Sequence, residues 1–277
     1  MIIVGSDQVW NSNITKQYLK DYLLEGIKCR KIAYAASLGS NDINEETKYL
    51  FKKLLSEFDF ISLREEDSVS YLKSICGDNN NYFTCIDPVF LLNKNQWLDF
   101  TTKSKYDLQD NDYILIYMLE YNSNLIESAK ILSKKYNMPI YSIEIPFVRI
   151  KKELINIRKL HDIGPIDFVK LFKNAKYILT NSFHGIAFSL IFNKKFASFA
   201  HSTLNLRIEN LLKLYGLKDN QIINKNNIDI EDVFINCEKA YKNLIIYDEI
   251  KKSEEYIINS INNCNLKKES KANTYFG

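Results

Sequence analysis

Residues 177–185 read YILTNSFHG and pass from an apolar, strand-like stretch directly into a helix-like stretch that continues to Phe192. A strand-to-helix turn of this kind leaves the amides of the first helical turn pointing beyond the edge of a sheet, where they can bind an anion. His184 adds an imidazole that titrates near neutral pH. The turn therefore indicates an α/β protein with a place for a charged ligand.

Short apolar runs of strand length alternate with amphipathic stretches of helical length on both sides of this turn. Strands are predicted at residues 2–4, 31–35, 60–63, 82–86, 113–118, 139–143, 177–179 and 196–199. Helices are predicted at residues 125–135, 166–172, 186–192, 206–215 and 248–261, after a helix capped by Asn44 and a helical stripe through Val69 and Leu72. Such alternation predicts an α/β protein with largely parallel sheets.

The same pattern predicts two domains. The polar stretch 101–112 is the expected boundary between them. We expect an N-terminal domain over residues 1–104, a C-terminal domain over 105–246, a last helix over 247–266 that packs back across the domains, and a polar tail over 267–277.

The composition excludes several classes of protein. Of the 277 residues 46% are hydrophobic, as in a globular protein. The formal net charge of +3 is too small to indicate a surface that binds nucleic acid. No apolar run approaches the roughly 18 residues of a membrane span, and no phosphate loop, G-x-G-x-x-G motif or cluster of metal ligands occurs. The five cysteines are odd in number and widely spaced, which favours reduced thiols over a disulfide framework. The predicted location is therefore cytoplasmic, at most peripheral to the inner face of the membrane.

Polar side chains that directly follow predicted strands are the candidate site residues, because ligands bind at the carboxyl ends of strands. Asp7, after the first strand, could accept a proton or bind sugar hydroxyls; alternatively Ser6 or Asp7 caps a turn or short helix. Arg64, after the strand 60–63, could bind phosphate or carboxylate; alternatively it pairs with the acidic residues 65–67.

The turn at 180–185 supplies the third group. His184 could transfer a proton or contact an anion, or it could be a capping or packing residue. Gly185 favours a site, since a missing side chain would let a ligand approach the backbone. Arg207, near the start of a later helix, is either a second anion ligand or a solvated charge at a helix end.

Three segments together resemble the polysaccharide pyruvyl transferase family. They are residues 4–11 (VGSDQVWN), 62–68 (SLREEDS) and 180–185 (TNSFHG), and Asp87-Pro88 resembles a further family feature. The resemblance extends from residue 1 to about residue 217. It implies two Rossmann-like domains similar to those of the GT-B glycosyltransferases, facing each other across a cleft.

The resemblance also implies a reaction. Enzymes of this family transfer the enolpyruvyl unit of phosphoenolpyruvate to two hydroxyls of a sugar and form a pyruvate ketal. By motif position, His184, Ser182 and Gly185 would bind the donor, with Arg64 facing it from the other domain and Arg207 nearby. Asp7, Gln8 and Asn205 would lie at the acceptor, and His184, Arg64 and Asp7 would be catalytic. The expected partners are phosphoenolpyruvate, as co-substrate, and a glycan or a lipid-linked or nucleotide-linked sugar as acceptor; no metal and no resident cofactor are implied.

In one respect the chain departs from the family. Members usually carry several dozen residues ahead of the G-S-D-Q segment, which here starts at Gly5. We therefore expect an incomplete N-terminal domain, an exposed edge on the first strand, poor solubility and little activity. Two other functions stay open: a GT-B glycosyltransferase that uses a nucleotide sugar, and a non-catalytic remnant that binds a glycan.

Site variants should fold and lose function. Arg64→Ala and His184→Ala are expected to leave the fold largely undisturbed, because polar residues at a sheet edge contribute little packing. Each should lose donor binding or turnover, since a charge-assisted contact contributes about 1.5 to 3 kcal/mol.

Overall fold

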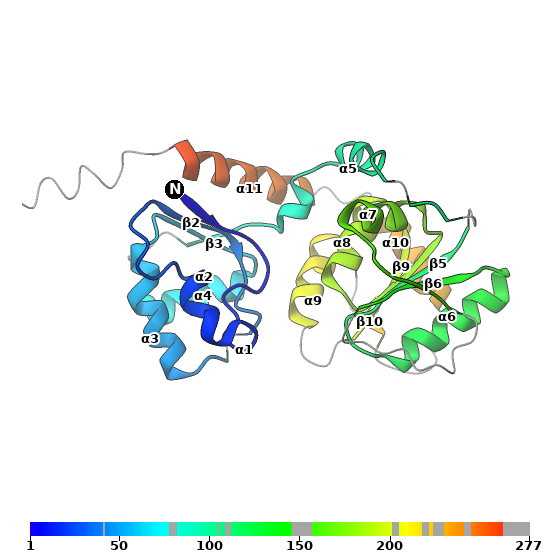
Figure 1. Ribbon diagram of the computed structural model, residues 1–277, viewed down its shortest axis with the longest axis horizontal. Coiled ribbons are helices and arrows are strands. Elements are labelled where there is room, and N and C mark those ends of the chain that lie inside the picture. The colour runs from blue at the N-terminus through cyan, green and yellow to red at the C-terminus, as the bar shows by residue number, and fades with distance from the viewer. Residues whose placement is uncertain are drawn as a thin grey trace, which may run out of the picture. The chain divides into compact units, whose positions relative to one another are not determined.

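The chain forms two compact α/β units, each with its own sheet (Figure 1). The computed structural model describes residues 1–40, 42–77, 82–104, 106–108, 112–145, 157–200, 205–217, 222–223, 230–240 and 245–262. Unit 1 comprises residues 1–91 and 247–277, and unit 2 comprises residues 92–246. The predicted α/β class is confirmed in both units.

Unit 1 contains a parallel sheet in which the strands follow one another in chain order. The strands are β1 (Ile2–Val4), β2 (Lys31–Ala36), β3 (Phe60–Leu63) and β4 (Tyr82–Thr84). The helices are α1 (Ser12–Thr15), α2 (Leu19–Tyr22), α3 (Glu45–Leu54) and α4 (Glu66–Cys76). As predicted, Asn44 caps α3, and its side chain accepts a hydrogen bond from the Thr47 amide at 2.9 Å. The core is built around Trp10, which is fully buried against the rings of Phe51 and Phe58.

The last helix, α11 (Ile245–Asn262), lies along unit 1 and confirms the helix predicted over 248–261 (Figure 1). The Tyr256 hydroxyl donates to the Ala33 carbonyl at 2.8 Å, and the Ile86 amide donates to Ser253 Oγ at 2.9 Å. The Ser253 hydroxyl thus gives the buried Ile86 amide an acceptor, and Tyr256 adds a second donor to the Ala33 carbonyl, which also accepts from Ser62 Oγ. Residues that follow unit 2 in the chain therefore complete the packing of unit 1.

Unit 2 contains a parallel sheet of six described strands in the order β10-β9-β8-β5-β6-β7. The strands are β5 (Ile114–Tyr117), β6 (Ile140–Ile143), β7 (Ile157–Leu160), β8 (Tyr177–Thr180), β9 (Lys195–Phe199) and β10 (Ile222–Ile223). From β5 the chain steps outward to β6 and β7, and then returns to the other side of β5 to form β8, β9 and β10. This is the doubly wound Rossmann order, whose direction reverses between β5 and β8, where such folds bind their ligands.

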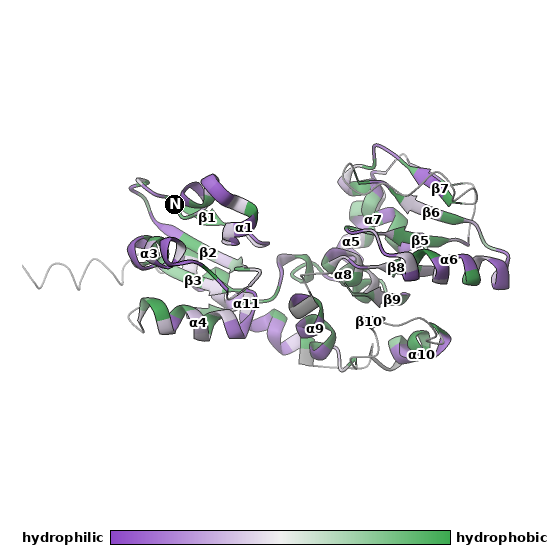
Figure 2. Ribbon diagram, turned by 90° about the horizontal axis from the view of Figure 1, so that it is seen from below, coloured by the Kyte–Doolittle hydropathy of each residue, from purple (hydrophilic) through white to green (hydrophobic). Residues whose placement is uncertain are grey.

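The helices of unit 2 are α5 (Lys94–Thr101), α6 (Ser123–Tyr136), α7 (Pro165–Asn174), α8 (Phe183–Ile191), α9 (Asn205–Leu214) and α10 (Ile230–Ala240). The strands other than β7 are predominantly apolar, α8 is apolar along most of its length, and the other helices carry both polar and apolar residues (Figure 2). Helix α5 belongs to this unit because Trp97 packs edge-on against Phe188, with ring centroids 5.0 Å apart. The units therefore divide between Leu91 and Leu92, ahead of the polar stretch 101–112 in which the boundary was expected.

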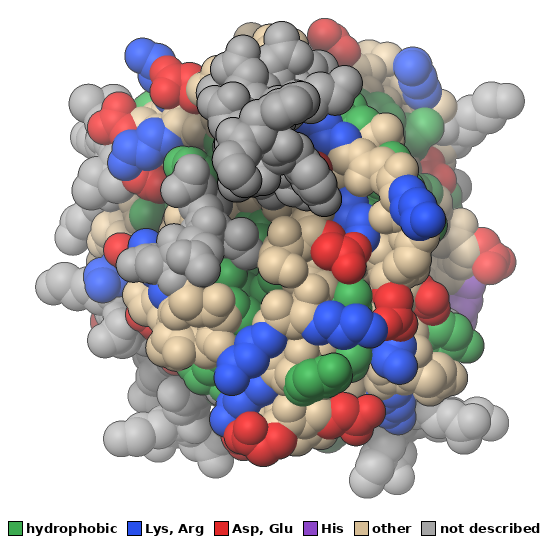
Figure 3. Space-filling view, turned by 90° about the vertical axis from the view of Figure 1, so that its left-hand side faces the viewer, with side chains coloured by type: hydrophobic (Ala, Val, Ile, Leu, Met, Phe, Trp, Pro, Cys, Tyr) green, Lys and Arg blue, Asp and Glu red, His purple; other side chains and the backbone are tan. Residues whose placement is uncertain are grey.

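Charges of both signs are interspersed on the face shown in Figure 3, in keeping with the small net charge. Within the described residues, no helix combines the length and the apolar character needed to cross a bilayer.

Lys194 lies half-buried in the segment between α8 and β9. Burial lowers the pKa of its ammonium group to about 8, and the positive charges of Lys94, Lys176 and Lys173 act in the same direction, against Asp112. The unfolded chain should hold this proton up to the ordinary lysine pKa of 10.5. Between these two values the unfolded state binds more protons, so the stability contributed by this site rises with pH.

Lys194→Gln is therefore expected to raise the melting temperature at pH 7, where the folded wild-type protein must hold a poorly solvated charge. The difference between the two proteins should shrink from pH 8 upward and vanish above pH 10.5. Melting curves at pH 7 and pH 10 test this, with Lys252→Gln, an exposed residue of α11, as the control. Equal melting temperatures for wild type and Lys194→Gln at pH 7 would show that the charged Lys194 side chain does not destabilise the folded state.

Candidate functional site

The turn that follows β8 is locked to the turn that follows β5, at the point where the strand order reverses. Asn181 is buried; its Oδ1 accepts from the Leu119 amide and its Nδ2 donates to the Glu120 carbonyl, both at 2.7 Å. The Thr180 hydroxyl donates to the Tyr117 carbonyl at 2.6 Å and accepts from the Ser182 amide at 3.0 Å. Both polar side chains therefore serve to fix the backbone of the turn rather than to meet a ligand.

Ser182 is the N-cap of α8. Its extended backbone and its Oγ, which accepts from the Gly185 amide at 3.4 Å, are the usual features of such a cap. The side chain is 1% exposed. Ser182 was expected at the donor, and the structure shows that its hydroxyl already has a structural partner.

Gly185 lacks a side chain for a different reason than the one expected. A Cβ built at Gly185 would lie 2.3 Å from Thr180 Oγ1, so the missing side chain makes room for Thr180 and not for a ligand. The space beside Gly185 is the buried interior between β8 and α8. The argument that this glycine admits a ligand is wrong.

Gly185→Ala is expected to destabilise unit 2 by about 1 to 3 kcal/mol, since the added methyl group must push Thr180 away from Tyr117. Thr180→Ser in the same chain removes a methyl group that also lies near the added Cβ and should recover only part of the loss. Chemical denaturation of the single and double variants measures both effects. A fully stable Gly185→Ala protein would mean that the turn relaxes freely.

His184 is the residue of this turn that reaches the surface. Its ring is partly exposed and meets Phe183 edge-on, with centroids 5.4 Å apart. Arg207, from α9, places its guanidinium carbon 5.8 Å from the centre of the same Phe183 ring. The structure thus brings together two of the predicted site residues around one phenylalanine, at the start of α8.

Arg207 is 8% exposed, so the alternative of a solvated charge at a helix end is wrong. A buried guanidinium over an aromatic face is oriented as well as charged, which suits recognition of a carboxylate or phosphate. Asn205 begins α9, but its side chain lies outside the described residues. His161 is exposed after β7, and His201 is also outside the described part of the chain.

The carboxyl edge of the sheet in unit 1 holds a second cluster, made by residues that follow β1, β3 and β4. Arg64 Nη2 lies 2.7 Å from Asp87 Oδ2, and both side chains are almost fully buried, at 5% and 3% exposure. Ser6 Oγ donates to Asp87 Oδ2 at 3.1 Å and accepts from Arg64 Nη2. Arg64 Nη1 lies 3.8 Å from Asp7 Oδ1.

The partners of Arg64 differ from those considered from sequence. Its ion pairs include Asp87 and Asp7, which come from other strand ends. Glu65 is buried and accepts instead from Ser37 Oγ at 2.8 Å. The sequence signal for Asp87 was the Asp-Pro dipeptide at a strand end, which could equally mark a turn; Asp87 does also cap the short helical turn Pro88–Phe90.

Asp7 is held in an unusual backbone conformation. Its φ is 79°, a left-handed value that costs about 1 kcal/mol for a residue with a side chain. The Ser37 amide donates to the Asp7 carbonyl at 2.9 Å, and Asp7 forms a parallel bridge with Ala36. The side chain is 58% exposed, so its carboxylate faces solvent.

Neither Ser6 nor Asp7 caps the short helix that follows, because the N-cap of α1 is Asn11. Gln8 Oε1 accepts from Asn11 Nδ2 at 2.6 Å. Gly39, with a φ of 71°, packs so closely on this pair that a Cβ would lie 2.3 Å from both polar atoms. The side-chain amide oxygen of Gln8, a residue expected at the acceptor, therefore has a partner within unit 1.

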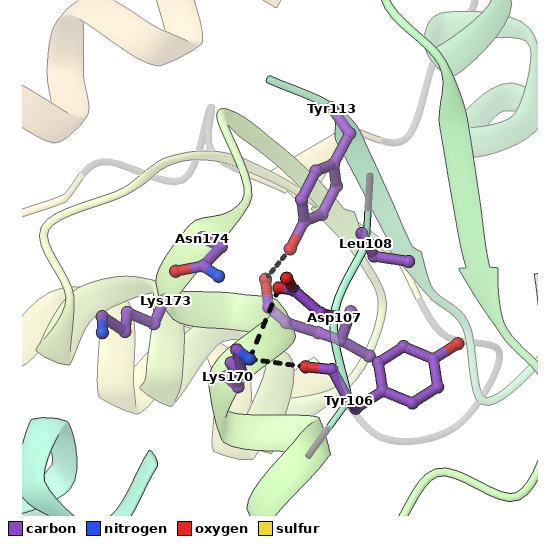
Figure 4. Close-up of a pocket in the computed structure, with 8 residues that line it drawn as sticks. Tyr106, Asp107, Leu108, Tyr113, Lys170, Lys173 and Asn174 are labelled. Atoms are coloured by element: carbon purple, nitrogen blue, oxygen red, sulfur yellow. Dashed lines mark hydrogen bonds and ion pairs between the residues drawn. The ribbon is translucent and has the colours of Figure 1, made fainter. Parts of the chain in front are cut away.

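A cavity of about 370 Å³ lies in unit 2 (Figure 4). It is lined by Tyr106, Asp107, Leu108, Tyr113, Lys170, Leu171, Lys173 and Asn174. Tyr113 precedes β5 and the lysines lie toward the end of α7, which places the cavity at the amino end of the sheet. Lys170 donates to the Tyr106 carbonyl at 2.5 Å and lies 3.5 Å from Asp107. None of the predicted site residues lines it.

No group of three or more His, Cys, Asp or Glu side chains that could hold a metal ion occurs in the described part of the chain.

Comparisons with solved structures support the fold. The UDP-GlcNAc 2-epimerase of Methanocaldococcus jannaschii matches with a TM-score of 0.55 and 16% identity, over 87% of this chain and 69% of the epimerase. The UDP-GlcNAc 2-epimerase of Neisseria meningitidis, solved bound to UDP-GlcNAc, matches with a TM-score of 0.52 and 16% identity, over 94% of this chain and 74% of the other. At this identity the likeness shows the fold alone, and it confirms the predicted pair of Rossmann-like units.

No curated protein matches the chain. The profile of the polysaccharide pyruvyl transferases matches residues 1–203, a span that contains β1 with Asp7, β3 with Arg64, and the whole β8–α8 turn with His184. The chain belongs to the polysaccharide pyruvyl transferase family.

Proposed function

We propose that this protein transfers the pyruvyl unit of phosphoenolpyruvate to two hydroxyls of a sugar, in a cell-surface polysaccharide or its precursor, and releases phosphate. The observation that carries the proposal is the arrangement at the start of α8, in a chain of this family. A partly exposed imidazole and an oriented guanidinium flank one aromatic ring beside the point where the strand order of unit 2 reverses.

The donor requires cationic partners, because phosphoenolpyruvate carries a carboxylate and a phosphate. Arg207 is suited to bind one of these groups, and the amides at the start of α8 add positive potential. His184 is suited to deliver a proton to the methylene carbon C3, which converts it to a methyl group and places positive charge on C2. The proposal retains the predicted role of Asn205 near the acceptor; the side chain of this residue is outside the described residues.

The remaining steps balance without an oxidant or a reductant. One sugar hydroxyl bonds to C2 and loses its proton to a general base. The bond from C2 to the phosphate oxygen then breaks, and the second hydroxyl bonds to C2 and closes the ketal. Of the two protons released from the sugar, one replaces the proton delivered to C3 and the other leaves on phosphate.

A glycosyltransferase that uses a nucleotide sugar is the second candidate. It is favoured by the likeness of the fold to an enzyme that was solved bound to UDP-GlcNAc. The two functions differ in their leaving groups, since pyruvyl transfer releases inorganic phosphate and glycosyl transfer releases a nucleoside diphosphate.

Phosphorus NMR of the protein with phosphoenolpyruvate and a panel of UDP-linked hexoses separates the candidates. Pyruvyl transfer predicts sugar-dependent loss of the phosphoenolpyruvate signal, with inorganic phosphate appearing and the UDP-sugar diphosphate unchanged. Release of UDP without consumption of phosphoenolpyruvate would establish glycosyl transfer instead. A glycan-binding remnant would change neither signal, and phosphoenolpyruvate would not raise its melting temperature.

A further inference from the structure

The cluster at the carboxyl edge of unit 1 contains two residues to which the proposed reaction gives no task, Ser6 and Asp87. Both touch Arg64: Asp87 Oδ2 lies 2.7 Å from Nη2, and the Ser6 hydroxyl joins the two charged groups. The pair is nearly inaccessible to water, and a buried ion pair of this geometry fixes the orientation of its guanidinium.

The charge of this cluster is not that of an anion site. Arg64 contributes one positive charge, whereas Asp87 and Asp7 contribute two negative charges within 4 Å of it. A phosphate or carboxylate that approached Arg64 would face these two carboxylates and would have to displace a buried counter-ion. A sugar hydroxyl is neutral and has a proton to donate, so the carboxylates would not repel it and it need not displace the counter-ion.

The exposed end of the cluster is the Asp7 carboxylate. The left-handed backbone of Asp7 is fixed by the bridge to Ala36 and by the Ser37 amide, and it directs the side chain outward while Arg64 Nη1 remains 3.8 Å away. Strained residues held by their surroundings are characteristic of functional sites.

We propose that Ser6 and Asp87 hold Arg64, and that Arg64 in turn holds the Asp7 carboxylate where it accepts the proton of a sugar hydroxyl. Arg64 is then a positioning residue on the acceptor side rather than a ligand of the donor. As the hydroxyl oxygen becomes a nucleophile, its O–H bond breaks and the proton moves to Asp7. This inference rests on the proposed function.

The arginine side chains offer a direct test, because the chain has only five arginines and their guanidinium signals can be resolved by NMR after selective labelling. In the wild-type protein the Arg64 signals should be those of a guanidinium that does not rotate. Ser6→Ala and Asp7→Asn should each change the chemical shifts of the Arg64 guanidinium. Asparagine tolerates the left-handed backbone, so Asp7→Asn should fold. Asp67→Asn, a matched change at an exposed carboxylate in the first turn of α4, should leave them in place.

Saturating phosphoenolpyruvate should shift the Arg207 signals and leave those of Arg64 unchanged. With an active sugar, Ser6→Ala should lower kcat about 100-fold, the usual effect of a misplaced catalytic group, and leave the KM for phosphoenolpyruvate unchanged. Shifts at Arg64 on addition of phosphoenolpyruvate, or a rise in that KM, would overturn the inference.

Failure of the proposed function would look different, since the wild-type protein would then neither bind phosphoenolpyruvate nor release phosphate. Even so, the apo spectra decide whether Arg64 holds Asp7: Arg64 signals that do not respond to Asp7→Asn would overturn that contact.

Discussion

Arg64→Ala should lower the free energy of unfolding of unit 1 by about 3 to 5 kcal/mol. The substitution leaves Asp87, only 3% exposed, as a buried carboxylate without its ion-pair partner, and removing one member of a buried pair has an effect of this size. This revises the expectation that sheet-edge variants leave the fold undisturbed, because Arg64 turns out to be inside the protein. Urea unfolding followed by the fluorescence of the buried Trp10, in a Trp97→Phe background, reports on unit 1.

Two further variants show whether the unpaired carboxylate is the cause. Arg64→Ala combined with Asp87→Asn should recover part of the lost stability, since a neutral amide then replaces the buried Asp87 carboxylate. Lys48→Ala, which breaks an exposed pair with Glu45 on α3, should change stability by no more than about 0.5 kcal/mol. A loss below about 1 kcal/mol in Arg64→Ala would contradict the description of Arg64 and Asp87 as a buried, mutually dependent pair.

His184→Ala should reduce turnover of phosphoenolpyruvate by about 100-fold to 10,000-fold, the range expected for loss of a general acid. Its ring is partly exposed and α8 keeps its cap from Ser182, so the variant should fold. Phosphate release under saturating phosphoenolpyruvate, with circular dichroism of the same sample, separates a loss of chemistry from a loss of structure.

The matched control is His161→Ala, an exposed histidine of the same unit that lies outside the β8–α8 turn. It should retain wild-type turnover. Turnover by His184→Ala within threefold of the wild type would remove His184 as the proton donor, and an equal loss in His161→Ala would point to a general effect of removing imidazoles from unit 2.

The strands and long helices could be predicted because their signals are local. The β8–α8 turn follows from an apolar run that stops at Thr180 and a capping serine at Ser182. Helix α5 was missed, although Asn93 and Gln96 form a capping box that is visible in the sequence. Strand β7 was missed because its two central residues are charged and exposed, and only pairing with β6 makes it a strand.

The site could be predicted only in part, because its partners are brought together by the sheet. From sequence the carboxylates nearest Arg64 are residues 65–67, whereas the parallel register of β3 and β4 places Asp87 against it. From sequence, Gly185 was expected to let a ligand approach the backbone. The residue that occupies the space beside it, Thr180, lies across the turn on β8. The burial of Arg207 against Phe183 likewise depends on how α9 packs, which the spacing of its apolar residues does not specify.

Calorimetric titration of phosphoenolpyruvate into the wild-type protein and into His184→Ala tests the central claim most directly. The account predicts saturable binding to the wild type and affinity at least about tenfold weaker in the variant, since loss of a charge-assisted contact has about this effect. Absence of binding to the wild-type protein, or equal affinity in the two proteins, would contradict the assignment of the β8–α8 turn as the donor site.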